Sequence, residues 1–165
     1  MQRLIDLISR VNRPGVDRII EHIKNSDFAT AKCGRHHLYP GGLVDHTLEV
    51  YNLMKSYSPN MPEESIIICA VMHDIDKAKV NGESFGKHPN GTVLVAKRCG
   101  LALTENEKFA ILKHHSMNLS DICSHYYRKV LTKADMQSTG KWRRENVGIT
   151  FKDIFCEIIA ATIRV

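Results

Sequence analysis

The residues best suited to chemistry are histidines and aspartates at or near the ends of apolar segments. His73 and Asp74 directly follow the apolar run that ends at Met72. Neighbouring residues on an α-helix point about 100° apart, so this pair can reach one centre only near a helix end or a kink. A divalent metal there would satisfy polar groups that are otherwise costly to bury. A histidine on a helix is more often a core or surface residue than a ligand, so the pair needs further donors.

Further donors of the same two types lie in or beside other predicted helices. Each stands next to apolar positions that would face a core, and they are His46, His88, His114, His115 and Asp135. Helical bundles hold metals through inward side chains of facing helices. Imidazole nitrogen and carboxylate oxygen suit Mn, Fe, Co, Ni or Zn, while the lack of a thiolate in this set disfavours a structural zinc site. The residue types therefore indicate a divalent metal centre.

Four segments that contain these donors follow one another in a definite order. They are His37 to Thr47 (HLYPGGLVDHT), Met72 to Lys77 (MHDIDK), Lys113 to His115 (KHH) and Ala134-Asp135. The ordered set resembles the HD-domain superfamily of metal-dependent phosphohydrolases, whose pattern is His, then His-Asp, then Asp. The segment YPGGLVDHTLEV is similar to HD domains in which a Gly-Gly turn leads into the helix of the first ligand. The resemblance runs from about Arg13 to Asp135, most of the chain.

Carried over position by position, the resemblance implies ligands for one or two metal ions. The primary ligands would be His46, His73, Asp74 and Asp135. His88 and His114 match histidines that bind a second metal in some HD families. His115 is an alternative to His114, or a substrate contact. Asp74 could bridge two ions if both positions fill.

The same resemblance implies hydrolysis of a phosphate ester or anhydride by a metal-activated water. A divalent ion lowers the pKa of a bound water toward about 7 and polarises a phosphoryl oxygen. Asp74 would be catalytic through the ion, and Lys77, the lysine of a His-Asp-x-x-Lys motif, would neutralise phosphoryl charge. Arg35 and His37 precede the first ligand and would contact the substrate, although they could equally belong to a surface loop.

One position departs from the pattern of the superfamily. Asp76 replaces the glycine that is common before the motif lysine. It either adds a carboxylate near the metal or at the helix end, or is a solvated acid paired with Lys77 or Lys79.

Apolar residues recur at three- and four-residue intervals along almost the whole chain, which predicts an all-α, single-domain bundle of about seven helices over residues 1–165. The apolar stripes span residues 4–11, 16–23, 43–54, 66–73, 109–112, 122–135 and 151–162. Thr92 to Cys99 suits a helix or a strand, and we favour a helix because no partner strand is visible. Thr104 and Glu107 form a capping-box pattern. The polar stretch from Lys79 to Asn90 predicts a loop.

Composition excludes several classes of protein. The chain has 165 residues, of which 43% are hydrophobic and 25% charged, so it fits one globular domain and not a disordered or fibrous protein. The longest uncharged apolar run, Ser65 to Met72, is far shorter than the roughly 20 residues that span a bilayer. No secretory signal is evident at the N-terminus, so we expect a cytoplasmic protein without a membrane role.

The cysteines and the net charge carry weaker information. The five cysteines are odd in number and widely spaced, which predicts small buried side chains and not a disulfide framework or a zinc knuckle. A net charge of +5 suits a polyanionic partner such as a nucleotide or nucleic acid, although many basic proteins simply solvate their lysines.

Three functions fit these observations. The first is a phosphohydrolase acting on a nucleotide or another small phosphate ester. The second is a 3′ to 5′ exonuclease on single strands, because the Tyr-Pro-Gly-Gly segment is also similar to HD exoribonucleases. Those proteins normally carry a separate nucleic-acid-binding domain, which we do not expect here, and Trp142 alone offers little surface for base stacking. The third is a non-catalytic HD domain that binds a nucleotide or a partner protein.

Overall fold

The structure, a computed structural model, describes residues 1–34, 36–116 and 125–140. These residues contain seven α-helices. They are α1 (Gln2–Ile8), α2 (Val16–Asn25), α3 (Gly42–Tyr57), α4 (Glu63–Met72), α5 (Asn90–Cys99), α6 (Glu105–Lys113) and α8 (Tyr126–Ser138). Two short 3₁₀ helices, η1 (Asp27–Ala29) and η2 (Ile75–Lys77), are added to these. The described residues contain no β-strand beyond isolated bridges. The expected all-α bundle of about seven helices is confirmed.

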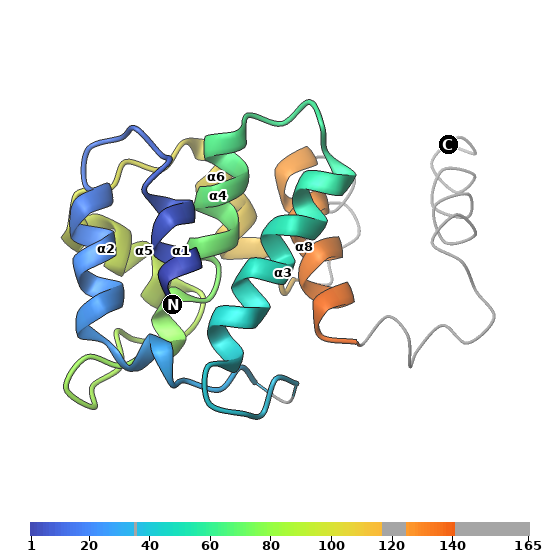
Figure 1. The fold of residues 1–165 in the computed structure, drawn as a ribbon. Coiled ribbons are helices and arrows are strands. Elements are labelled where there is room, and N and C mark those ends of the chain that lie inside the picture. Colours follow the sequence, from blue (N-terminus) through green and yellow to red (C-terminus); the bar gives the residue numbers. More distant parts are fainter. Residues whose placement is uncertain (35, 117–124, 141–165) are drawn as a thin grey trace, which may run out of the picture.

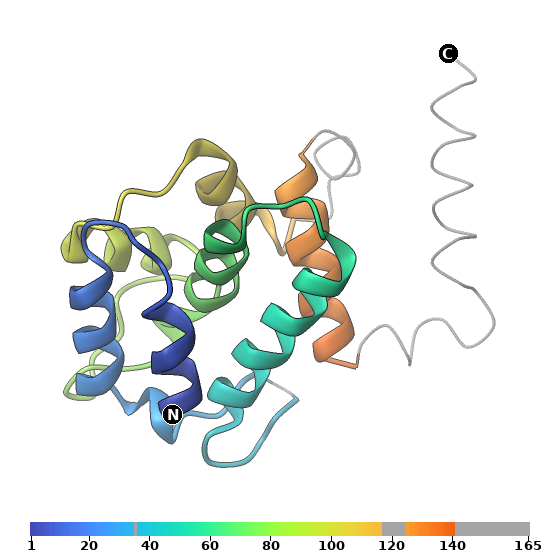
Figure 2. The same cartoon turned by 45° about the horizontal axis from the view of Figure 1, so that its top comes forward.

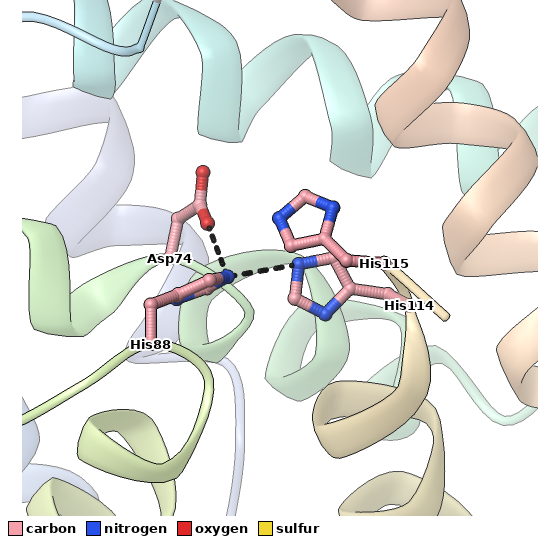
Figure 3. Close-up of side chains that lie close together, drawn as sticks. All are labelled: Asp74, His88, His114 and His115. Carbon is pink, nitrogen blue, oxygen red and sulfur yellow. Dashed lines mark hydrogen bonds and ion pairs between the residues drawn. The ribbon is translucent and has the colours of Figure 1, made fainter. Parts of the chain in front are cut away.

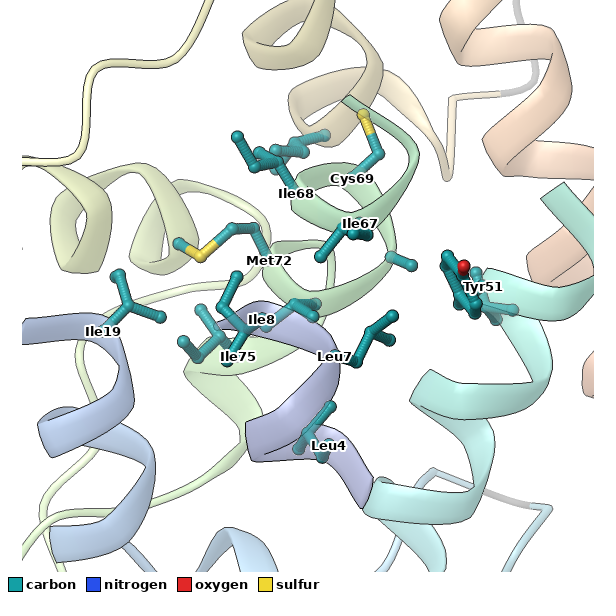
Figure 4. Close-up of a cluster of buried hydrophobic side chains, with 14 of the residues drawn as sticks. Leu4, Leu7, Ile8, Ile19, Tyr51, Ile67, Ile68, Cys69, Met72 and Ile75 are labelled. Atoms are coloured by element: carbon teal, nitrogen blue, oxygen red, sulfur yellow. The ribbon is translucent and has the colours of Figure 1, made fainter. Parts of the chain in front are cut away.

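Helix α4 lies at the centre of the bundle (Figures 1 and 2). It packs against α1, α3 and α6, while α8 packs against α3 and α6, and α5 against α2 and α6. All residues from Ser65 to Met72 are buried, which explains why this helix is apolar on every side. Figure 4 shows Ile67 and Met72 on the side of α4 nearer to α1, and Ile68 on the opposite side. None of the described helices is long and apolar enough to cross a membrane.

Local sequence signals explain most helix boundaries. The side chain of Thr104 accepts from the backbone N–H of Glu107, and the Glu107 carboxylate accepts from the backbone N–H of Thr104, so the predicted capping box begins α6. The segment that suited a helix or a strand is helix α5. The polar stretch from Lys79 to Pro89 is a loop, as expected.

The first helix is shorter than its apolar stripe. Helix α1 ends at Ile8, and Val11 is buried in the turn that follows. The chain turns between Ser9 and Gly15, and Val11 fills the core from this turn. Three predictions concern residues outside the described part of the chain. They are the last predicted helix at residues 151–162, the start of the 122–135 stripe before residue 125, and the role of Arg35.

Candidate metal centre

The His-Asp pair lies where the central helix ends. His73 is the C-terminal cap of α4, and Asp74 leaves the helix with φ −125° and ψ 12°. Both side chains are buried, at 0% and 1% exposure. Because adjacent residues in a regular helix point about 100° apart, this break in the helix is what allows His73 and Asp74 to face one centre.

The four predicted primary ligands come together from three helical segments. His46 on α3 has its Nε2 atom 3.0 Å from His73 Nε2, 3.3 Å from Asp135 Oδ1 on α8 and 3.4 Å from Asp74 Oδ2. All four residues are buried. Three of them, His46, His73 and Asp135, place one donor atom each within 4.8 Å of one another.

Hydrogen bonds on the far side of each ring determine which nitrogen faces this centre. His73 Nδ1 lies 2.8 Å from the Ala70 carbonyl oxygen, which can only accept, so Nδ1 carries the hydrogen. His46 Nδ1 lies 3.0 Å from Ser138 Oγ, whose hydrogen is donated to Glu49 Oε2 at 2.7 Å, so His46 Nδ1 is again the donor. The two Nε2 atoms therefore face each other, and a proton or a metal ion between them makes that approach favourable.

The charges of the centre support the same conclusion. Burial opposes the negative charge of Asp74, but the imidazoles of His73 and His46 and the Lys77 ammonium hold the pKa of its carboxyl well below the usual range. Burial disfavours a charged His46, yet the carboxylates of Asp135 and Asp74 raise its pKa to about 11. Without a metal, a proton on His46 supplies the positive charge that two buried carboxylates demand.

A second group of donors lies on the other side of Asp74 (Figure 3). His88 Nε2 is 3.5 Å from Asp74 Oδ1 and 3.3 Å from His114 Nε2. His114, the C-terminal cap of α6, donates from Nδ1 to the Ile111 carbonyl at 2.6 Å, and burial lowers its pKa to about 3, so its Nε2 carries a lone pair at neutral pH. His115 completes the group, with its side chain 52% exposed.

Asp74 connects the two groups through its two oxygens. Oδ2 faces His46 and His73, while Oδ1 faces His88 and has no hydrogen-bond partner among the described residues. A buried carboxylate oxygen without a hydrogen bond, beside imidazole nitrogens that carry lone pairs, is an arrangement that a divalent cation stabilises. The residues therefore fit one metal ion on each side of Asp74.

Two further side chains contact the same carboxylate. Lys77 at the end of η2 donates from Nζ to Asp74 Oδ2 at 2.5 Å, and its side chain is 26% exposed. Cys33 donates from Sγ to the same oxygen at 3.6 Å and is fully buried. Burial of Cys33, Cys69 and Cys99 agrees with the expectation for these three cysteines, while Cys123 and Cys156 lie outside the described residues. The contact of Cys33 with the site was missed, since no motif spacing marks it.

The loop before α3 brings two more histidines over His46. The ring centroids of His36 and His37 lie 5.0 and 5.5 Å from that of His46, and His37 Nε2 lies 3.4 Å from Glu49 Oε2. Gly42 allows this approach, because a Cβ atom there would lie 2.0 Å from the His37 carbonyl oxygen. The Gly-Gly turn thus brings the loop against the site.

Of the two roles that the sequence allowed for Asp76, the solvated acid paired with Lys77 or Lys79 is wrong. It is 5% exposed, and its Oδ1 accepts hydrogen bonds from His88 Nδ1 at 2.9 Å and from Thr92 Oγ1 at 3.0 Å. It therefore supports a residue of the second donor group and lies beside the centre.

Comparison with known proteins agrees with this geometry. The family model described as HD domain matches residues 43–144, a range that contains all six predicted metal ligands. Neither the comparison with curated proteins nor that with solved structures gives a match.

Proposed function

Because the chain belongs to the HD-domain family, a superfamily of metal-dependent phosphohydrolases, we propose that it hydrolyses a phosphate ester or anhydride of a nucleotide or similar small phosphorylated substrate. The observation that carries this proposal is that three imidazole Nε2 atoms, of His46, His73 and His88, lie within 3.5 Å of the two oxygens of buried Asp74. A fourth Nε2 atom, of His114, lies 3.3 Å from that of His88. Such a set suits two late first-row ions on either side of a bridging carboxylate.

Each ligand has a role in this proposal. His46, His73 and Asp135 would hold one divalent ion and His88 and His114 the other, with Asp74 between the two sets. When bound, Mn, Fe, Co, Ni or Zn supplies an activated water and charge stabilisation at the phosphoryl group.

Other side chains surround the place where the phosphate would lie. Lys77 is partly exposed and next to Asp74, so its ammonium can bind a phosphoryl oxygen as charge develops in the transition state. His115 is exposed at the edge of the second donor group, and His37 lies at the edge of the first, so both can contact the substrate. We propose the same for Arg35, which adjoins His36 in the chain.

Metal analysis combined with a phosphate-release screen tests the proposal. Purified protein is loaded with Mn or Zn, its metal content is measured, and phosphate release is followed over nucleoside mono-, di- and triphosphates. We expect hydrolysis that a chelator abolishes and that Asp74→Asn lacks. A ladder of 3′-shortened products from a 5′-labelled single strand, without release from free nucleotides, would favour the exonuclease instead. Nucleotide binding without turnover in metal-loaded protein would favour the non-catalytic domain.

A further inference from the structure

The histidines of the centre differ in what holds their rings. His73 and His114 donate from Nδ1 to backbone carbonyls one turn back in their own helices, and His46 donates to a serine on α8. His88 lies in the loop between η2 and α5, where no helix supplies such a carbonyl. Its ring is held instead by the carboxylate of Asp76 at 2.9 Å.

This carboxylate sets the tautomer of His88. An ionised carboxylate only accepts hydrogen bonds, so the hydrogen of the neutral ring is on Nδ1 and the lone pair is on Nε2. Nε2 is the atom that faces Asp74 and His114. Partners of this kind on metal-ligating histidines fix both ring orientation and tautomer.

The surroundings of Asp76 are built to keep it in place. Thr92 at the start of α5 donates a second hydrogen bond to Oδ1. The neighbouring Gly91 leaves the space for the carboxylate, because a Cβ atom at position 91 would lie 2.7 Å from Asp76 Oδ2. Burying a carboxylate is costly, and Oδ2 has no hydrogen-bond partner among the described residues, so the two hydrogen bonds to Oδ1 indicate that the residue at position 76 serves the ring it contacts.

We propose that Asp76 is a positioning residue that holds His88 in the Nδ1–H tautomer and thereby determines whether the second ion binds. The inference rests on the two-ion centre of the proposed function. It assigns a role to the one position at which the His-Asp-x-x-Lys segment departs from its superfamily pattern.

Two readouts test it, and one of them needs no metal. Two-bond ¹H–¹⁵N spectra of metal-free, ¹⁵N-labelled protein report the tautomer of each histidine ring, with His88 assigned by its loss in His88→Gln. We expect Nδ1–H in the wild type and a mixture with Nε2–H in Asp76→Ala. The second readout is ions per chain under graded chelator competition, in which Asp76→Ala should bind the second ion about 10 to 100 times more weakly. The first ion should be unaffected.

Two more variants keep the test informative if Asp76→Ala folds poorly. Thr92→Val removes one donor to Asp76 while keeping the side-chain shape, and it should weaken the second ion in the same direction by a smaller factor. Glu107→Gln changes another buried carboxylate, away from the centre, and should leave both ions and the His88 spectrum unchanged. Thermal melts establish that each variant is folded.

The outcomes separate this inference from the proposed function. A His88 tautomer and a second-ion affinity that are unchanged in folded Asp76→Ala would overturn the inference and leave the phosphohydrolase proposal intact. A wild-type chain that takes up only one ion under saturating metal would overturn the two-ion centre, and the inference with it. An equal loss of the second ion in Glu107→Gln would show that the effect is general destabilisation.

Discussion

Replacing Lys77 by Met should reduce catalysis far more than folding. The substitution keeps most of the apolar stem and deletes the ammonium that donates to Asp74 Oδ2 at 2.5 Å. Among the described residues the ion pair of Lys77 is with Asp74, and not with Asp76 or Glu83, which the sequence alone would also permit. The lysine therefore lies beside the carboxylate that we propose as the bridge between two ions.

The loss of folding stability can be bounded from the contacts that remain. Asp74 keeps His46 and His73 at 3.4 Å and the thiol of Cys33 at 3.6 Å, so its charge is not left unpaired. The cost is then closer to one charged hydrogen bond, about 1.5 to 3 kcal/mol, than to the 3 to 5 kcal/mol of a stranded buried charge. A chain of this size should lose roughly 3 to 12 °C in Tm.

Catalysis should fall by a larger factor. Removing a charged donor that acts mainly on the transition state costs about a hundredfold to a thousandfold, or 2.7 to 4 kcal/mol. Such a contact lowers kcat and kcat/KM together. Because domains are stable by about 5 to 15 kcal/mol, the variant should remain almost entirely folded at 25 °C, so unfolding cannot account for the loss.

Steady-state phosphate release by metal-loaded protein, with melts of the same samples, measures both quantities. Lys79→Met is the matched control, since Lys79 is an exposed lysine two residues away, and it should retain the wild-type rate. If folded Lys77→Met hydrolyses substrate at the wild-type kcat/KM, Lys77 is a structural ion-pair residue and the catalytic role is wrong.

Three further changes test other parts of the structure. Asp74→Asn should abolish hydrolysis and lower metal content at both positions by elemental analysis, because one oxygen faces each donor group; full metal content would contradict the bridge. Gly42→Ala should lower the free energy of unfolding by about 1 to 3 kcal/mol in urea titrations, because its Cβ would lie 2.0 Å from the His37 carbonyl oxygen; unchanged stability would contradict this close approach. Burial opposes the charge of Glu107, but hydrogen bonds from Arg13 and Ser65 lower the pKa of its carboxyl below 4.5. The ionised Glu107 carboxylate therefore stabilises the folded state above about pH 4.5, and this contribution is lost as pH falls through the folded-state pKa. Melts should therefore show Glu107→Gln less stable than the wild type at pH 7, with a smaller difference at pH 3; a constant difference would refute the linkage.

Features that depend on neighbouring residues in the chain could be predicted from the sequence. The capping box at Thr104 and the polar loop after Lys79 were located because each has a signal within a few residues. The end of α4 at the His-Asp pair could be inferred because two adjacent residues cannot share a centre inside a regular helix. The ordered set of His and Asp segments gave the only long-range information, because it indicated which donors from distant parts of the chain lie together.

Features that depend on tertiary contacts could not be predicted in this way. Cys33 reaches Asp74 across 41 positions, and Ser138 holds His46 across 92 positions, without any spacing that a local pattern would reveal. Cys33 looked like a small core residue, and it is buried as such a residue should be. Its contact with Asp74 follows only from how the loop before α3 packs against the end of α4.

Asp76 shows the difference between features set by neighbouring residues and features set by tertiary contacts. From the sequence alone, the carboxylate of Asp76 next to the His-Asp pair could face water or the centre. The choice is made by residues that come later in the chain: Gly91 leaves room, Thr92 donates a hydrogen bond, and His88 needs a partner for Nδ1. Gly91 and Thr92 carry no signal of their own, and together with His88 they make the buried orientation of Asp76 the favourable one. Substituting Gly91 or Thr92 should therefore affect the second donor group through Asp76, even though neither residue belongs to that group.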